Sequence, residues 1–159
     1  MVFLVLKHNS DKFFEIRNRK LHREYEVSSV YEAGVVLLGT EVKSVKAGCA
    51  EINDSFVMVD RAGFLLLCNA RIDEYKFGNY ANHEVCRKRR LLLHAREIRK
   101  IRAGIEKDGI SVVPSRMYLK NGLIKVELAL GKGKKLYDKR ADLKAKTIKR
   151  ETDRFLLNR

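Results

Sequence analysis

The sequence predicts a mainly β protein with helices, in which short, curled strands form a small closed or partly open barrel. The strongest indication is Asn121-Gly122, which joins two segments of alternating apolar residues and is typical of a two-residue hairpin turn. A second pair of short apolar runs flanks a glycine-containing turn at residues 60–63. After Gly131 apolar residues become too sparse to form a core, so a basic tail follows the barrel.

The residue types at 24–46 predict the first strands and a short helix. Residues 24–38 are rich in Tyr and Val and indicate one or two strands, with Gly34 as a bulge or bend. Residues 40–46 fit a short helix that Thr40 caps and Gly48 ends.

The middle of the chain predicts a hairpin, a loop and one long helix. Residues 55–59 and 64–68 are expected to pair across their turn, and residues 77–90 form a loop that ends in a basic run at 87–90. A helix is predicted over 91–107, where apolar residues recur every three or four positions. Its apolar face consists of Leu91, Ala95, Ile98, Ile101 and Ile105.

The last two strands can be given a register. A two-residue turn places Leu119 opposite Ile124 and Met117 opposite Val126, all four facing the core. Lys125 then faces outward. In all, we expect about six strands, one short helix and one long helix.

We expect one domain with an appendage at each end: an N-terminal leader at 1–17, a β-barrel domain at 18–130 and a basic tail at 131–159. The apolar run near the N-terminus is too short for a signal sequence, and no stretch approaches the ~20 apolar residues of a spanning helix. The three cysteines form no CxxC pair. These features predict a cytoplasmic protein with no membrane partner.

The charge of the chain predicts a polyanionic partner. The formal net charge is +14, and residues 131–159 carry eleven Lys or Arg residues against four acids, a net +7. Such a charge favours RNA or DNA as the partner.

No catalytic or metal-binding constellation converges in the sequence. Residues 34–40 have the glycine spacing of a phosphate-binding loop, but Thr40 stands where that loop needs its lysine. His83 and Cys86 form one H-x-x-C without the second pair that a zinc site requires. We therefore predict no catalysis, no metal and no cofactor; an RNA-processing enzyme on a small barrel is the alternative from another class.

Two basic runs, at residues 17–23 and 87–90, enter the predicted barrel and favour contacts with RNA phosphates. A ribosomal or RNA-chaperone module would be equally basic. The aromatic residues available to stack on bases are Tyr25, Tyr31, Tyr75, Phe77, Tyr80 and Tyr137.

The tail has a thin apolar stripe at helical spacing, which makes an isolated helix marginal in water. It is either a disordered solubilising tail or a segment that is disordered when free and becomes helical in a negatively charged groove. The bulky residues Tyr137, Ile148 and Phe155 favour the second interpretation, because a solubilising tail does not need them.

Several short blocks run collinearly from about residue 18 to the C-terminus. They are YEAGV at 31–35, GTEVKS at 39–44, DSF at 54–56, LLLHAREI at 91–98, LKNG at 119–122, VELA at 126–129 and GKGKKLYDKR at 131–140. With these blocks the sequence resembles the bacterial SsrA-binding protein (small protein B) family.

The resemblance implies an oligonucleotide-binding (OB)-type β-barrel with flanking helices and no catalysis. It implies that one monomer binds the tRNA-like domain of transfer-messenger RNA and delivers it to ribosomes stalled without a stop codon, where incomplete proteins are tagged for degradation. The tail is then expected to occupy the decoding centre and the empty messenger channel.

The resemblance and the basic runs together define the candidate residues. Residues predicted to bind RNA are Arg19, Lys20, His22, Arg23, Glu32, Lys43, Arg87, Lys88, Arg89, Arg90, Leu92, His94 and Lys125. Residues predicted to act at the decoding centre and along the tail path are Lys132, Lys134, Lys135, Tyr137, Asp138, Lys139, Arg140, Ile148, Phe155 and Leu156. Glu32 is the acid of the YEAG block, and its carboxylate can accept hydrogen bonds from bases or 2′-hydroxyls.

Overall fold

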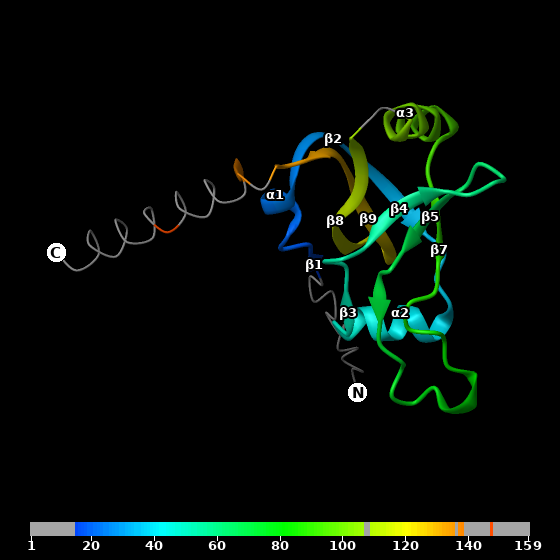
Figure 1. Cartoon of the computed structure of the whole chain (residues 1–159). Coiled ribbons are helices and arrows are strands. Elements are labelled where there is room, and N and C mark those ends of the chain that lie inside the picture. The colour runs from blue at the N-terminus through cyan, green and yellow to red at the C-terminus, as the bar shows by residue number, and fades with distance from the viewer. Residues whose placement is uncertain (1–14, 107–108, 136, 139–146, 148–159) are drawn as a thin grey trace, which may run out of the picture.

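The computed structural model describes residues 15–106, 109–135, 137–138 and 147. It is mainly β, with α-helices placed around a curved sheet (Figure 1). In chain order the elements are β1 (Glu15–Arg17), α1 (Leu21–Glu24), β2 (Tyr25–Val35), α2 (Gly39–Lys46), β3 (Ala50–Glu51), β4 (Phe56–Val59), β5 (Leu65–Cys68), β6 (Arg71–Ile72), the 3₁₀ helix η1 (Asn79–Ala81), β7 (Arg89–Leu92), α3 (Ala95–Ile105), β8 (Ile110–Lys120) and β9 (Leu123–Gly133).

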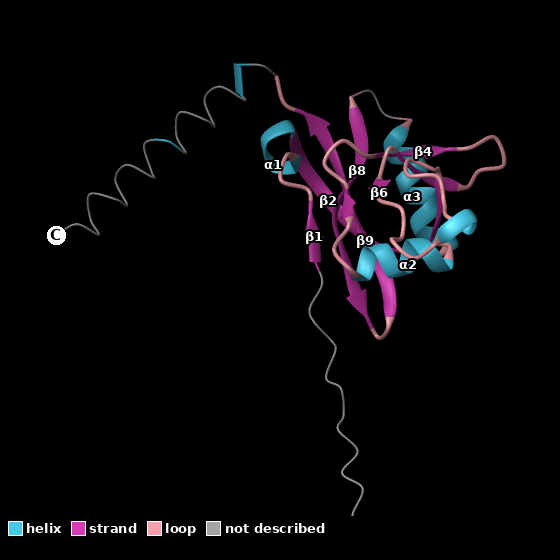
Figure 2. Ribbon diagram, turned by 90° about the horizontal axis from the view of Figure 1, so that it is seen from below, coloured by secondary structure: helices cyan, strands magenta, loops and turns pink. Residues whose placement is uncertain are grey.

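Seven strands form one antiparallel sheet in the order β1-β8-β9-β2-β7-β5-β4, and β3 pairs with β6. Figure 2 shows the long strands β2, β8 and β9 running side by side through the middle of this sheet. The sheet curls so that β4 comes to lie against β8, although the two are not hydrogen-bonded neighbours. The result is the partly open OB-like barrel that the sequence predicts, with more strands than expected.

The register of the last hairpin is confirmed. Leu119 pairs with Ile124 and Met117 with Val126, and both members of the second pair are fully buried. The turn residues have positive φ angles, 51° at Asn121 and 76° at Gly122, as a type I′ turn requires. The hairpin predicted at residues 55–68 is confirmed by the pairing of β4 with β5.

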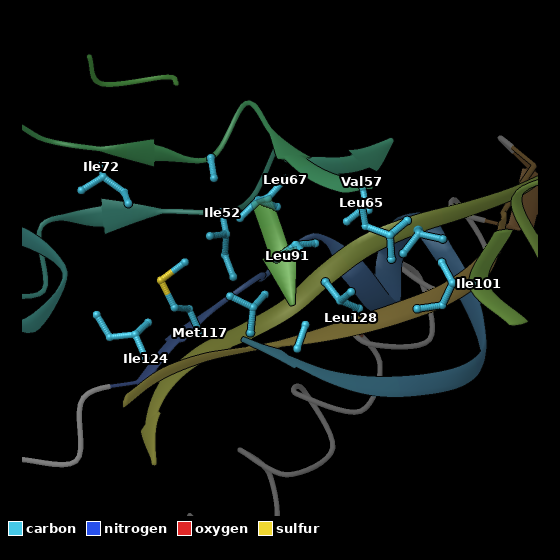
Figure 3. Close-up of a cluster of buried hydrophobic side chains, with 14 of the residues drawn as sticks. Ile52, Val57, Leu65, Leu67, Ile72, Leu91, Ile101, Met117, Ile124 and Leu128 are labelled. Atoms are coloured by element: carbon cyan, nitrogen blue, oxygen red, sulfur yellow. The ribbon is translucent and has the colours of Figure 1, made fainter. Parts of the chain in front are cut away.

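The core lies between the concave face of the long strands and the hairpin formed by β4 and β5. Figure 3 shows Leu65 and Leu67 from β5 facing Met117 from β8 and Leu128 from β9. Ile101 of α3 is also fully buried and joins this cluster. One continuous apolar cluster thus holds α3 and both halves of the barrel together.

Two expectations for the first strand and helix are wrong in detail. The bulge in β2 lies between Val27 and Ser29 rather than at Gly34, and the Ser28 hydroxyl donates to the Leu130 carbonyl oxygen at 3.0 Å. The predicted short helix is α2, which begins at Gly39, so Thr40 lies inside it and does not cap it.

The long helix is shorter than predicted. Leu91 and Leu92 belong to β7, and α3 begins only at Ala95. Leu91 is buried by alternation along a strand, which fits its sequence position as well as the helical period does. The backbone N–H of His94 donates to the Glu97 carboxylate at 3.1 Å, which explains why the helix starts there.

The sheet extends three residues beyond each expected boundary of the barrel domain. Residues 15–17 form β1, which pairs with Arg116, Met117 and Tyr118 of β8. At the other end β9 continues through Gly133, which pairs with Tyr25.

Candidate nucleic-acid interface

Three candidate residues that are far apart in sequence meet around Gly34. In the antiparallel register Gly34 of β2 lies opposite Leu92 of β7 on one side and opposite Lys125 of β9 on the other. Glu32 lies two residues earlier on β2 and therefore faces the same side of the sheet. The fold thus brings an acid, an apolar residue and a cation onto one outer surface.

The absence of a side chain at Gly34 opens a groove in this surface. A Cβ there would lie 3.3 Å from the Cβ of Leu92, so a larger residue would crowd the floor. The groove has a volume of about 340 Å³, and Leu92 and Leu123 on its walls are more than half exposed. Its lining is otherwise aliphatic and ends at Lys125, which suits an apolar group that carries a negative charge at one end. We call it the Gly34 groove.

Glu32 is held ionised at the edge of this surface. Its carboxylate accepts hydrogen bonds from Lys120 Nζ at 2.7 Å and from the Tyr118 hydroxyl. The bonds from Lys120 and Tyr118 lower the pKa of Glu32 below its usual range. Burial and the nearby Glu32 carboxylate raise the pKa of Tyr118 to about 12, so the phenol stays protonated and donates. A carboxylate has about four acceptor sites, so Glu32 can still accept bonds from a ligand.

The residues that orient Glu32 are not among those predicted from the sequence. Tyr118 pairs directly with Lys125, and its ring lies 4.9 Å from the Arg116 guanidinium, which also binds Glu127 at 2.7 Å. The register of the Asn-Gly hairpin already implied that Tyr118 faces the same side as Lys125. That signal was sufficient to add Tyr118 to the predicted site.

Arg89 does not reach the surface, and the prediction that it contacts RNA is wrong. Its side chain is fully buried and ion-paired with the equally buried Glu41 at 2.8 Å. The same guanidinium donates to the carbonyl oxygens of Ala70, Val85 and Arg87. Arg87, two residues earlier, also donates to Glu41, to Oε2 at 2.6 Å, and its side chain is only one-third exposed. These two cations of the basic run therefore serve an internal ion cluster.

Glu41 is ionised despite its burial. Burial alone would raise its pKa, but hydrogen bonds from Arg87 and from the Leu38 amide, with the charge of Arg89, keep the pKa below its ordinary value of 4.5. Burial lowers the pKa of Arg89, yet a guanidinium starts so far above neutrality that it keeps its proton. Glu41 is thus the anion that permits two arginines to lie inside the fold.

We expect Glu41→Gln to destabilise the protein at neutral pH and much less in acid. The folded pKa of Glu41 lies below the unfolded one, so its contribution is complete above the unfolded pKa and is lost as the pH falls through the folded value. Urea unfolding of both proteins from pH 7 to pH 3 should show their free energies of unfolding converging below about pH 4.5. The exposed Glu26→Gln is the control; a pH-independent gap for Glu41→Gln would contradict the prediction.

The remaining candidates of the body lie on the surface but form separate groups. Lys88, Arg90, Leu92 and His94 are exposed before, along and after β7, and the Arg90 guanidinium lies 3.4 Å from the centre of the Phe64 ring. Lys43 is exposed on α2.

Another group of candidates surrounds α1. Lys20 binds Asp54 at 2.5 Å, Arg23 binds Glu24 at 2.9 Å, and the backbone N–H of Arg19 donates to Asn53. This group lies at the start of β2, and Gly34 lies near its end, up to about 30 Å along the strand. The structure therefore does not bring all predicted RNA-binding residues together.

The basic tail departs from the barrel beside α1. The backbone N–H of Lys134 donates to the Glu24 carbonyl oxygen at 2.8 Å, and its Nζ donates to the His22 carbonyl oxygen at 2.9 Å. Tyr137 is 82% exposed. Lys132, Lys135 and Asp138 are also exposed. The tail candidates that lie outside the described residues are Lys139, Arg140, Ile148, Phe155 and Leu156.

The part of the chain that the structure describes has neither a metal cluster nor a membrane-spanning helix. It contains no group of three or more His, Cys, Asp or Glu residues placed to hold a metal ion. No helix among those residues has the length and apolar character needed to cross a membrane.

The fold and this surface define a small OB-like β-barrel protein with a basic tail. The family model described as SmpB protein matches residues 15–158, so the chain belongs to the SmpB protein family. The resemblance seen in the motif blocks is thereby confirmed.

Relatives agree along most of the chain. An SsrA-binding protein of Pelobacter propionicus is 51% identical over 139 residues, covering 87% of this chain and 91% of that protein. One of Oceanobacillus iheyensis is 49% identical over 140 residues, covering 88% and 90%. A chain of the solved structure described as "tmRNA-SmpB: a journey to the center of the bacterial ribosome" is 41% identical, with a TM-score of 0.65, and covers 77% of this chain and 86% of that one.

Proposed function

We propose that this protein is a non-catalytic RNA-binding adaptor of trans-translation. It binds the tRNA-like domain of transfer-messenger RNA as one monomer per RNA and brings it to stalled ribosomes in the cytoplasm. Membership of the SmpB family supports this role, and so do relatives named for binding SsrA. The observation that carries the proposal is that Glu32 and Leu92, from two family-like blocks, meet Lys125 of the Asn-Gly hairpin around Gly34.

The surface around Gly34 suits a folded RNA with an exposed loop. Lys125 and Lys120 supply positive charge for phosphates, and the groove wall at Leu92 offers an apolar contact for a base or ribose. Glu32 supplies the acceptor that a purely basic surface lacks, since Lys and Arg only donate. The combination distinguishes RNA groups by hydrogen bonding as well as by charge.

The tail has a separate part in the proposal. Its exit beside α1 lies at the far end of β2 from Gly34, so the tail can reach a second partner while the groove is occupied. We propose that it enters the decoding centre and the vacant messenger channel, with its basic residues against ribosomal RNA and Tyr137 and the bulky apolar residues setting its position.

We expect Glu32→Gln to weaken binding of a transcript of the tRNA-like domain by about 10- to 100-fold, although the variant is more positive overall. The loss corresponds to one or two hydrogen bonds to a charged acceptor, at about 1.5–3 kcal/mol. Filter binding or fluorescence anisotropy at fixed, physiological salt measures it, because affinity for RNA depends strongly on salt.

The control is Glu26→Gln, which makes the same charge change on the same strand but near the α1 end. It should bind the transcript as tightly as the wild type does, or slightly more tightly. Equal affinities for both variants would remove Glu32 from the site. A wild-type protein that binds the transcript no better than an unrelated structured RNA of equal length would overturn the proposed function.

A further inference from the structure

The loop between β6 and β7 presents bare aromatic rings to solvent. It projects from the end of the barrel that α2 covers (Figure 1). Phe77 is 73% exposed and Tyr80 is completely exposed. Large aromatic side chains gain free energy by burial, so rings left in water at the tip of a loop call for an explanation from binding.

The loop is held by polar contacts that do not involve these two rings. The Asn82 side chain accepts from the Tyr75 backbone N–H at 3.0 Å and donates to the Tyr75 carbonyl oxygen at 2.9 Å, as a paired strand would. The Gly78 N–H donates to the same carbonyl oxygen, and a Cβ at Gly78 would lie 2.8 Å from the Asn82 side chain. The tight fold of the loop therefore fixes where Phe77 and Tyr80 are presented.

Buried His83 anchors the C-terminal end of the loop. One ring nitrogen lies 2.9 Å from the Thr40 hydroxyl on α2, and the other lies 3.1 Å from the Ile72 carbonyl oxygen. Because these bonds fasten the loop to α2 and β6, the loop is preorganised before any ligand arrives.

Charged groups of both signs flank the rings. Lys43 Nζ on α2 lies 5.0 Å from the centre of the Tyr75 ring, and Tyr75 in turn meets Phe77 edge-on at 5.6 Å. Lys76 is exposed between the two aromatic residues. Of the neighbouring acids, Asp73 is bound by Arg71 at 2.9 Å, and Glu74 and Glu84 are exposed.

This composition fits a nucleic acid better than a protein partner. The buried centre of a protein–protein interface is depleted of charged residues. Residues 73–84 include Ala81 as their only aliphatic side chain and alternate rings with polar and charged groups. Rings that stack on bases beside lysines that meet phosphates are the usual arrangement for single-stranded RNA.

We propose that the loop at residues 73–84 is a second RNA contact, in which Phe77 and Tyr80 stack on unpaired bases and Lys43 and Lys76 meet the adjoining phosphates. The inference rests on the proposed function in that it assumes an RNA partner, but it uses a different surface. Helix α2 separates the two sites: Val42 lines the Gly34 groove, and Lys43 faces the loop.

The test uses the full chain and two short probes, a labelled oligouridylate and an abasic oligonucleotide of the same length and charge. Phe77→Leu/Tyr80→Leu keeps apolar bulk but removes the π faces, and should weaken oligouridylate binding by about 5- to 100-fold. The matched control Phe77→Tyr/Tyr80→Phe keeps both rings and should bind like the wild type. Binding of the abasic probe should be weaker and equal for all three proteins.

Unchanged oligouridylate binding by the leucine variant overturns the inference, and so does a wild type that binds both probes equally. If the leucine variant loses its binding to ribosomes but keeps its binding to oligouridylate, the rings do not stack on unpaired bases and the inference is equally overturned. The variants should unfold at the same temperature as the wild type, which would show that the exposed rings do not stabilise the fold. The proposed function is tested separately, by binding of the tRNA-like transcript to the Glu32→Gln variant. The proposed function and the inference about the loop can therefore fail independently of each other.

Discussion

Replacing Arg89 by methionine is expected to destabilise the protein by about 3–5 kcal/mol, because the change leaves a buried carboxylate without one of its charge partners. Arg89 and Glu41 are both fully buried, and the three carbonyl oxygens that Arg89 serves would lose their donor as well. Urea unfolding at neutral pH measures the loss. A basic residue chosen from the sequence as an RNA contact should thus act chiefly on stability.

The neighbouring Arg90→Met is the matched control. Arg90 is exposed, and its removal costs only its contact with the Phe64 ring, about 0.5–1 kcal/mol. The double change Glu41→Met/Arg89→Met should recover part of the stability lost in Arg89→Met, since it removes both buried charges together. Equal losses for Arg89→Met and Arg90→Met would contradict the structural role of the buried pair.

The ion cluster also explains how the Gly34 groove keeps its shape. Glu41 belongs to α2 and Arg89 to β7, so their bond fastens the helix to the strand that carries Leu92. Val42, next to Glu41, and Leu92, three residues after Arg89, both line the groove. The buried charges therefore position the proposed RNA surface without touching RNA themselves.

Local signals in the sequence were enough for the hairpins. Asn121-Gly122 determines a turn with two positive φ angles, and the register of β8 and β9 follows from it because side chains alternate along a strand. The same register brings Lys125 to the surface. These features depend on residues that are neighbours in the chain, so they can be predicted from the sequence.

The run RKRR at 87–90 shows where such reasoning fails. As a strand it alternates, so Arg89 points inward and Arg90 outward, but a count of charges treats the two alike. The counter-ion that makes the inward arginine possible, Glu41, lies 48 positions earlier, and nothing in the local pattern marks it. The prediction of a helix at Leu91 is wrong for a related reason, since a buried position in a short strand can also fit a helical period.

The convergence at Gly34 was only half predictable. Glu32, Leu92 and Lys125 were each chosen from family-like blocks or from the hairpin, yet their meeting depends on β7 pairing with β2. That pairing joins residues almost 60 positions apart, and strand order across such a separation is fixed by the whole core rather than by local residue types.

Truncating the chain after Lys135 is expected to abolish tagging on stalled ribosomes while leaving most of the affinity for the tRNA-like transcript. The cut spares the Gly34 groove and both hydrogen bonds of Lys134 to the α1 region. It removes eight Lys or Arg residues and four acids, a net +4, together with Tyr137 and the bulky apolar residues. Translation of a message without a stop codon, followed by detection of the tagged product, measures the loss.

A scrambled tail separates charge from position. A chain whose residues 136–159 are shuffled keeps the same net charge but moves Tyr137, Ile148 and Phe155, and it should be as inactive as the truncated protein. If the scrambled tail restores tagging, the tail acts only through its charge. If the truncation reduces affinity for the transcript as strongly as it reduces tagging, the tail belongs to the RNA-binding surface itself. If the two ends of β2 serve separate partners, the truncated protein must still bind the transcript while it no longer supports tagging.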